Sequence, residues 1–325
     1  MPRSFPKIDP HVHFRDQNEA YKETISHGLD LAKSQGVEIV FDMPNTKPAL
    51  LGEKELKERL KLVPKREKGR YFLYLGITPK EKQIKEAVFC YRKYREVIGF
   101  KMYAGESVGD LGVVLLKDQE KVYRVLSKLN YKGVIAVHCE KKEYLKNNLF
   151  NPQNPISHFY SRPKEAEIEA IRDQIKLVKK ANFKGHLHIV HVSTAESVEI
   201  IDKVRKEISI SCAVTPHHIL WTKDKLKEKN GLLYKINPPL RERKNIEKLR
   251  KFLKEGKIDW IETDHAPHQV GEKLFPPYLS GFPSLYFYRE FTEDFLPQIG
   301  LSQNEIKKLT FENIYKVFKN KLTKL

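Results

Sequence analysis

The feature that most constrains the fold is the alternation of eight short apolar runs with amphipathic stretches. The apolar runs favour strands because they are rich in β-branched and aromatic residues. They lie at 7–13, 38–43, 70–76, 97–103, 134–139, 186–192, 208–214 and 259–263. The stretches with helical spacing lie at 21–34, 53–63, 81–94, 119–129, 164–180, 195–206 and 245–254. Eight strands alternating with helices predict an α/β fold, a (β/α)8 barrel with a parallel sheet inside.

The domain organisation follows from the length and the absence of breaks. A chain of 325 residues is long enough for one large barrel. It contains no tandem repeat, low-complexity tract or linker rich in proline and glycine. We therefore expect one domain over 1–325, with the tail from about 284 to 325 forming helices packed on the barrel.

The charge and the cysteines narrow the class of protein. The formal net charge is +18, but the lysines interleave with acids, as in 53–59. That pattern is typical of solvated helix faces with i,i+4 pairing, not of a nucleic-acid-binding tract. Three widely separated cysteines imply no disulfide framework. The sequence shows neither an apolar signal core nor a run long enough to cross a membrane, so we expect a cytoplasmic protein.

Five short segments carry candidate metal ligands, and each closes one of the predicted strands. They are DPHVHFRD at 9–16, GFKMY at 99–103, AVHCE at 136–140, HIVHVS at 188–193 and TDHAPH at 263–268. In a barrel of this type the carboxyl ends of the strands carry the chemistry. Imidazoles with one lysine and one carboxylate form a nitrogen and oxygen ligand set suited to zinc or a similar divalent metal.

The first and last strands are expected to share one metal. His11 and His13 are two residues apart, so their side chains leave the same face of a strand. Asp264 ends the last strand, which lies beside the first in a closed barrel. A lone strand histidine is usually structural, but His-x-His at the opening of a barrel indicates a metal pair.

The residues alone leave other assignments open. Lys101 by itself is as consistent with a buried ion pair as with a ligand. His217 and His218 are as consistent with structural or ligand-supporting roles as with direct ligation.

The sixth predicted strand holds three histidines. Strand alternation puts His186 and His188 on the face opposite to His191. Cys139 follows His138 directly, so we expect it to face away from the site and to contribute only packing.

These segments resemble the dihydroorotase family of the amidohydrolase superfamily over nearly the whole chain. The dihydroorotase domain of the animal multifunctional pyrimidine-synthesis protein looks most similar. The resemblance also includes MPNTKP at 43–48, TPHH at 215–218, NPPLR at 237–241 and the stretch 264–283. It implies a barrel of the metal-dependent hydrolase type. Many relatives build a small β-sandwich from both chain ends, but His11 lies too near the start for one, so we expect none.

The resemblance implies two Zn²⁺ ions per chain. The metal ligands would be His11, His13, Lys101, His138, His191 and Asp264. The first two histidines and Asp264 would hold the more buried ion, and the other two histidines the second. Lys101 would carry a carboxylated amine that bridges both ions, because an ammonium has no lone pair for a metal. Asp264 would be the catalytic residue that takes a proton from the attacking water and passes it to the departing ring nitrogen.

The resemblance also implies a substrate with a carboxylate. The expected substrate-binding residues are Arg15, Asn45, Ser107, His268 and Gly281. Arg15 lies two residues after His13 on the same face, and its planar guanidinium suits a carboxylate. A structural pairing of Arg15 with Asp16 is the alternative.

The loop after Lys101 departs from the animal-like pattern. That pattern has Thr and Phe where Ser107 and Val108 stand. Ser107 keeps a hydroxyl, but Val108 lacks an aromatic ring to cover the substrate.

The expected activity is the zinc-dependent, reversible hydrolysis of the cyclic amide of L-dihydroorotate to N-carbamoyl-L-aspartate in pyrimidine biosynthesis. Two alternatives stay open. One is another cyclic amidohydrolase, such as a dihydropyrimidinase, hydantoinase or allantoinase, whose neutral rings give Arg15 nothing to bind. The other is a non-catalytic barrel that supports aspartate transcarbamoylase. Association with that enzyme and a homodimer are the partner expectations, with neither nucleic acid nor membrane as a partner.

Overall fold

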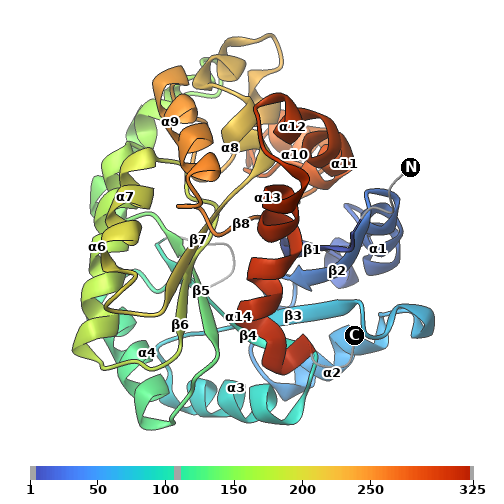
Figure 1. Cartoon of the computed structure of the whole chain (residues 1–325), viewed down its shortest axis with the longest axis vertical. Coiled ribbons are helices and arrows are strands. Elements are labelled where there is room, and N and C mark those ends of the chain that lie inside the picture. Colours follow the sequence, from blue (N-terminus) through green and yellow to red (C-terminus); the bar gives the residue numbers. More distant parts are fainter. Residues whose placement is uncertain (1–4, 106–110, 323–325) are drawn as a thin grey trace.

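The computed structural model describes residues 5–105 and 111–322, so Ser107 and Val108 lie outside the described residues. Eight parallel strands follow one another in chain order around a barrel (Figure 1). They are β1 Lys7–Val12, β2 Val37–Asp42, β3 Tyr71–Gly76, β4 Val97–Ala104, β5 Val134–Cys139, β6 His186–Ile189, β7 Ile210–Val214 and β8 Trp260–Ile261. The predicted barrel is confirmed. The strands β6 and β8 are shorter than predicted, because the backbone leaves the ladder early at the functional end.

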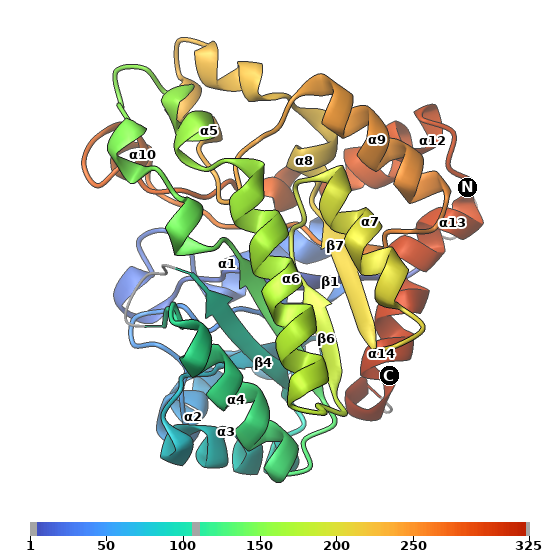
Figure 2. The same ribbon diagram turned by 90° about the vertical axis from the view of Figure 1, so that its left-hand side faces the viewer.

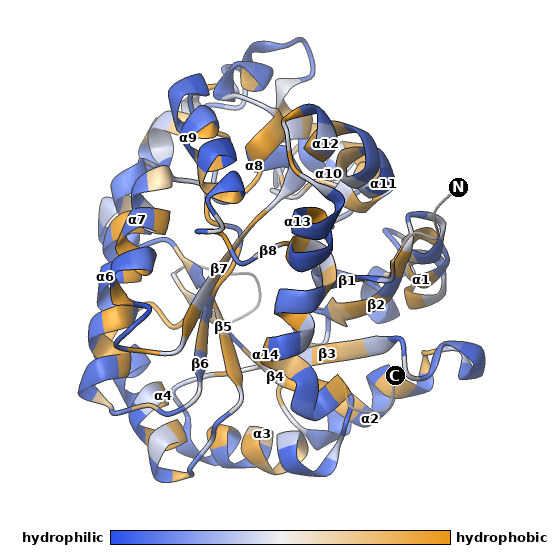
Figure 3. Ribbon diagram, in the orientation of Figure 1, coloured by the Kyte–Doolittle hydropathy of each residue, from blue (hydrophilic) through white to orange (hydrophobic). Residues whose placement is uncertain are grey.

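Helices cover the outside of the barrel. The longer ones are α1 Ile25–Ser34, α2 Glu53–Lys61, α3 Glu81–Lys93, α4 Leu116–Lys128, α6 Lys164–Lys180, α7 Ala195–Val204 and α9 Arg243–Lys254. Short helices lie in the loops after β5, β7 and β8: α5 Ser157–Ser161, α8 Pro216–Leu220 and α10 Val270–Leu274. Figure 3 shows apolar residues along the strands and mixed faces on the helices. None of the helices within 5–105 and 111–322 has the length and apolar character needed to span a membrane.

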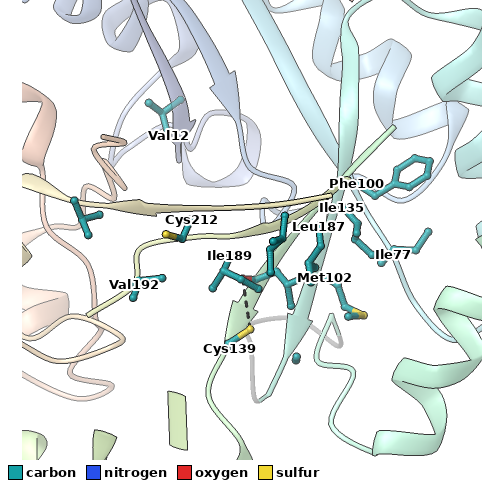
Figure 4. Close-up of a cluster of buried hydrophobic side chains, with 14 of the residues drawn as sticks. Val12, Ile77, Phe100, Met102, Ile135, Cys139, Leu187, Ile189, Val192 and Cys212 are labelled. Carbon is teal, nitrogen blue, oxygen red and sulfur yellow. Dashed lines mark hydrogen bonds between the residues drawn. The ribbon is translucent and has the colours of Figure 1, made fainter. Parts of the chain in front are cut away.

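The main core lies between the strands and these helices. Phe100, Ile135, Leu187 and Ile189 belong to it, and all four are at most 1% exposed (Figure 4). Close packing of such side chains is the main stabilising contribution to a barrel. Cys139 lies in the same cluster, on the outer side of β5, and packs there as expected.

The C-terminal helices are α11 Tyr288–Glu290, α12 Leu296–Gln298, α13 Gln303–Lys307 and α14 Asn313–Leu322. The first three pack on the main core, and α14 completes a second core that fills the inside of the barrel. Phe318 of α14 packs against Phe41, Tyr74 and Trp260, with ring centroids 4.9, 6.4 and 6.3 Å away. Figure 2 shows α14 at the opposite end of the barrel from α5 and α10. The helix therefore covers the amino-terminal ends of the strands.

The seam between β8 and β1 is held together by a side chain as well as by backbone contacts. One backbone bridge pairs Val12 with His265. Below it, the Asp9 carboxylate accepts hydrogen bonds from the Thr263 amide (3.0 Å) and the Thr263 hydroxyl (2.5 Å). Burial raises the pKa of Asp9 to about 7, although the Thr263 hydrogen bonds oppose the shift. The barrel thus closes beside the segment that carries His11 and His13.

A buried ion pair fixes the segment that follows His13. Arg59 of α2 donates to the Asp42 carboxylate (2.6 Å), to the carbonyl of Arg15 (2.7 Å) and to the carbonyl of Phe14. The Tyr71 hydroxyl also donates to Asp42 (2.5 Å). Arg59 and Asp42 are fully buried. A buried pair of this kind stabilises only when its remaining polar atoms are satisfied, as they are here.

We predict that Arg59→Met lowers the free energy of unfolding by about 3–5 kcal/mol, because the Asp42 carboxylate stays buried without its cation. Urea denaturation followed by circular dichroism measures the change. The matched control is Arg66→Met, since Arg66 is 68% exposed and its buried partner Glu67 keeps a second cation, Arg70. That variant should stay within about 0.5 kcal/mol of the wild type. Equal losses in the two variants would contradict the role of the buried pair.

Candidate metal centre and substrate pocket

The predicted site residues meet at the carboxyl ends of the strands, around a cavity of about 130 Å³. The cavity is lined by His11, His13, Arg15, Asn45, Lys101, His138, His191, Asp264 and Gly281. His268 lies directly behind Arg15. Ser107 lies outside the described residues, so its place is not assigned.

Three ligand atoms converge at the first metal position. The Nε2 atoms of His11 and His13 are 3.2 Å apart, and Asp264 Oδ1 lies 3.3 and 2.9 Å from them. Ligands at about 2.1 Å from a tetrahedral zinc ion are about 3.4 Å from one another. One divalent ion therefore fits in contact with all three atoms.

Each of these imidazoles is held through its other nitrogen. His11 Nδ1 lies 3.0 Å from Glu262 Oε1, and His13 Nδ1 lies 2.7 Å from Asn45 Oδ1. A hydrogen bond at Nδ1 fixes the tautomer whose Nε2 lone pair faces the metal. Sequence reasoning missed Glu262, although a carboxylate inside an apolar run, two residues before Asp264, was a visible signal.

A second ligand pair lies at the ends of β5 and β6. His138 Nδ1 and His191 Nε2 are 3.1 Å apart. His138 Nε2 lies 3.1 Å from Glu140, and Arg162 donates two hydrogen bonds to the same carboxylate, at 2.9 and 2.7 Å. Burial works against this charge, yet Arg162 and His138 hold the pKa of Glu140 well below its usual value. The anionic Glu140 therefore orients His138 with Nδ1 toward the cavity.

His191 reaches the cavity because β6 ends at Ile189 and the backbone turns. His191 has a φ of 36°, in the left-handed region that residues other than glycine rarely adopt. Its amide donates to Glu262 at 2.7 Å, which holds the turn in place. Asp264 has a φ of 48°. Left-handed backbone at two ligand positions is a form of strain that functional sites often carry.

This turn corrects the expectation for His186 and His188. They do not lie on the face opposite to His191, because the strand pattern stops before it. His188 is on the inner side of the barrel, with Nε2 3.2 Å from Glu262 and its ring 4.3 Å from that of Trp260. Its function in this structure is to support Glu262.

Lys101 lies among the four candidate histidine ligands and has an unusual environment. It is 1% exposed, and its ammonium has no hydrogen-bond partner among the described residues. Burial lowers the pKa of Lys101 to about 8. A buried amine without a partner is costly. It is well placed to be carboxylated, because a carbamate would supply two oxygen ligands. The donor set thus fits two divalent ions.

Arg15 forms the part of the wall suited to an anion. Its Nε donates to the Pro267 carbonyl, and its NH2 group lies 3.2 Å from His268 Nε2. It makes no ion pair with any residue in 5–105 or 111–322. Asp16 does not pair with it, because that carboxylate accepts hydrogen bonds from the amides of Gln17 and Ile25. The alternative of a structural pair between neighbours is wrong.

Gly281 and Asn45 also line the cavity. Gly281 has a φ of 150°, and a Cβ atom there would lie 2.7 Å from the Ala266 carbonyl oxygen and 2.8 Å from His268. Only glycine fits this approach. The side-chain carbonyl oxygen of Asn45 accepts a hydrogen bond from His13. The side-chain NH2 group of Asn45 is therefore left to donate into the cavity.

Sequence reasoning did not assign four further residues that line the cavity: Tyr103, Asn237, Ala266 and Ser280. The Tyr103 hydroxyl is buried and has no partner within the described part of the chain. Tyr103 follows Lys101 by two residues in β4, so strand alternation could have found it.

His217 and His218 lie near the cavity but outside the ligand set. His217 Nδ1 lies 2.8 Å from the Ser284 hydroxyl. His218 contacts Thr215 and the Pro238 carbonyl, at 2.8 and 3.0 Å. These contacts support a structural role for His218 and join His217 to the segment after Phe282.

Comparisons with known proteins place this site in a family context. No family model matches the chain. A protein named dihydroorotase from Pyrococcus furiosus is 35% identical over 82% of this chain and 55% of its own length. Another of that name, from Methanosphaera stadtmanae, is 29% identical over 95% of this chain and 68% of its own length. The chain thus spans about half to two thirds of the length of these relatives.

Solved structures agree on the barrel. The L-hydantoinase (dihydropyrimidinase) from Arthrobacter aurescens superposes with a TM-score of 0.83 at 22% identity, over 96% of this chain and 70% of that one. The dihydroorotase from Campylobacter jejuni superposes with a TM-score of 0.70 at 18% identity, over 96% and 83% of the two chains. A special likeness to the animal multifunctional protein stays a prediction. Over most of its length the chain is a homologue of proteins named dihydroorotase, and its barrel has the same fold as these solved structures.

Proposed function

We propose that the protein is a dihydroorotase that interconverts L-dihydroorotate and N-carbamoyl-L-aspartate. The observation that carries this proposal is the unpaired, buried Arg15 beside two sets of metal ligands in one cavity. The substrate has a cyclic amide to be hydrolysed and a ring carboxylate to be bound. Arg15 suits that carboxylate, and the names of the relatives support the same reaction.

We propose that two Zn²⁺ ions bind here. His11, His13 and Asp264 would hold one, His138 and His191 the other, and a carboxylated Lys101 would bridge them. Bound divalent ions lower the pKa of water and polarise a carbonyl, which is the chemistry that amide hydrolysis needs.

Asp264 is the proposed proton carrier. Its Oδ1 lies at the cavity between His11 and His13. Burial opposes its charge, but both imidazoles keep the pKa of Asp264 well below its usual value. The carboxylate is therefore ionised and ready to accept the proton of the attacking water. It then donates that proton to the ring nitrogen that leaves, or runs these steps in reverse for ring closure.

The substrate side of the cavity orients the ring. Arg15 and the Asn45 amide would bind the carboxylate, with His268 holding the Arg15 guanidinium in place. Gly281 lets this wall pack closely against Ala266 and His268, since a Cβ atom there would clash with both. This placement would bring the cyclic amide over the ligand sets, since Arg15 and His13 leave the same face of the chain.

The runner-up is a cyclic amidohydrolase for neutral rings, favoured by the close superposition on a hydantoinase. Neutral rings would leave the Arg15 charge unpaired in the cavity, which is costly. A non-catalytic barrel is less well supported, because every expected ligand is present. Association with aspartate transcarbamoylase, a homodimer and a cytoplasmic location stay predictions.

The metal centre is tested with Lys101→Ala. We expect the wild type to bind about two divalent ions per chain. The variant should lose the second ion and its activity, because the bridge is gone. Mass spectrometry of the metals and an assay with dihydroorotate measure both, and added short carboxylic acids should restore part of the activity. Wild-type activity with full metal content in the variant would rule out a bridging Lys101.

Proton transfer is tested with Asp264→Asn. The amide keeps an oxygen near His11 and His13 but cannot accept a proton. We expect kcat to fall by roughly two to four orders of magnitude in both directions. Initial rates of ring opening and ring closure, measured with metal content, check this. A loss below tenfold with metals retained would mean that another group carries the proton.

Substrate choice is tested with Arg15→Met. Loss of a partner for a desolvated carboxylate should lower kcat/KM for dihydroorotate at least about a hundredfold. Any activity on dihydrouracil, which lacks the carboxylate, should barely change. Equal losses on both substrates would assign Arg15 to the fold or the metal site. A wild-type preference for dihydrouracil would refute the proposed function.

A further inference from the structure

One wall of the substrate cavity is held from behind by two buried lysines. The wall is the segment 278–281, which follows α10 and contributes Ser280 and Gly281 to the cavity. Lys273 lies in α10 and Lys235 in the loop before the NPPL stretch. Neither lysine belongs to the metal centre, and neither forms an ion pair with any of the described residues.

Lys273 binds three backbone carbonyls at once. Its ammonium donates to Gly281 at 2.5 Å, to Lys235 at 3.2 Å and to Leu279 at 3.4 Å. Its side chain is 4% exposed. An ammonium has three donors, so this arrangement uses all of them. Lys273 thus fixes the Gly281 carbonyl at the wall of the cavity.

Lys235 binds the same wall, and we call Lys235 and Lys273 together the clamp. Its ammonium donates to the Tyr278 carbonyl at 2.7 Å and to the Ser280 hydroxyl at 2.9 Å. Its own carbonyl accepts a hydrogen bond from the Gly281 amide at 3.0 Å. Four successive residues, 278–281, are therefore bound by these two lysines.

The wall is connected to Arg15 through His268. The Ser280 carbonyl lies 3.2 Å from His268 Nε2, and the same nitrogen lies 3.2 Å from the Arg15 guanidinium. A shift of Ser280 or Gly281 therefore moves the partner of the residue proposed to bind the substrate carboxylate. Small displacements of such positioning groups have large effects on binding and rate.

The two lysines of the clamp carry charge without an ion-pair partner in the described part of the chain. Burial lowers the pKa of Lys273 to about 7, and the positive charge of Lys235 adds to the shift. Burial and Arg162 lower the pKa of Lys235 to about 8. Lys273 is therefore protonated below about pH 7 and loses its charge as the pH rises. A nearby anion stabilises the protonated form and raises the pKa again.

We propose that Lys273 is a positioning residue whose ammonium fixes the Gly281 wall, and that an anionic ring entering the cavity draws a proton onto it. The identity of that ring as dihydroorotate rests on the proposed function. The clamp gives the site a preference for anionic ligands beyond that of Arg15, and it links their binding to proton uptake.

Few other groups near the clamp titrate in the same pH range as Lys273. His268 and His217 face Lys273 from the adjoining loop and from α8, and burial lowers the pKa of His268 to about 2 and that of His217 well below its usual value. Both imidazoles are therefore neutral above pH 6. Lys235 is the remaining charged group that faces Lys273.

The test uses the metal-loaded protein and the pH dependence of KM for dihydroorotate, from about pH 6 to about pH 9. In the wild type, KM should rise by up to about tenfold per pH unit above pH 7, as the clamp loses its proton. Lys273→Arg keeps a charge at this position at every pH, so its KM should stay flat until Lys235, whose pKa is about 8, begins to lose its proton. Lys273→Met should have a KM raised roughly tenfold at pH 6 and little pH dependence from the clamp. kcat should change far less than KM.

Calorimetry with orotate, a ring that carries the same carboxylate, provides a second readout. Heats measured at pH 7 in two buffers of different ionisation enthalpy should show proton uptake by the wild type and much less by Lys273→Arg, because Lys235 is still largely protonated at that pH. Lys251→Met is the matched control, because Lys251 is 71% exposed, and it should behave as the wild type.

The outcomes separate this inference from the proposed function. Wild-type protein that turns over dihydroorotate with a flat KM, or binds orotate without proton uptake, would overturn the role of Lys273 alone. So would a Lys273→Met variant that folds and keeps the wild-type profile. If that variant does not fold, Lys273→Arg and the calorimetry decide. Wild-type protein that binds orotate with proton uptake but does not act on dihydroorotate would support the clamp and refute the proposed reaction.

Discussion

The buried carboxylate of Glu262 is the interaction on which the rest of the site depends. It lies just after β8, yet it holds the His11 ring from β1 and the His191 amide after β6, and it contacts His188 within β6. Burial opposes its charge, but His11 and His188 keep the pKa of Glu262 well below its usual value. The Glu262 carboxylate thus sets the tautomer of His11, a candidate ligand of the first metal position. It also holds the backbone turn that places His191, a candidate ligand of the second. The two ligand sets are therefore coupled through the fold as well as through Lys101.

The site is built where the regular sheet stops. Within the barrel, strand alternation sends apolar residues such as Leu187 and Ile189 outward, toward the helices. At His191 and Asp264 the backbone enters the left-handed region, and both side chains turn into the cavity. The cost of that conformation is offset by hydrogen bonds such as the one from the His191 amide to Glu262. Short strands at the functional end are thus part of how the ligands converge.

The sequence contains enough information for the barrel, because hydrophobic periodicity records which residues face the core. It also predicts the His11–His13 pair and the return of Asp264, since strand geometry and barrel closure fix both. The sequence does not reveal that β6 ends before His191, because no sequence pattern marks a left-handed turn at a histidine. Glu262, His188 and the Lys273 clamp were missed for a related reason. Each acts through partners that are far away in the chain, and those pairings exist only once the barrel has closed.

Helix α14 has a consequence for how the chain is made. The interior rings of Phe41, Tyr74 and Trp260 have Phe318 as a packing partner, and the free edge of β1 meets the segment after β8 through the Val12–His265 bridge. Contacts of such long sequence separation form late and slow folding. During synthesis, the first strands have an open seam and an uncovered aromatic interior until β8 and α14 have also left the ribosome. The incomplete barrel then exposes apolar surface that favours aggregation, so slower growth or a chaperone should favour the folded product.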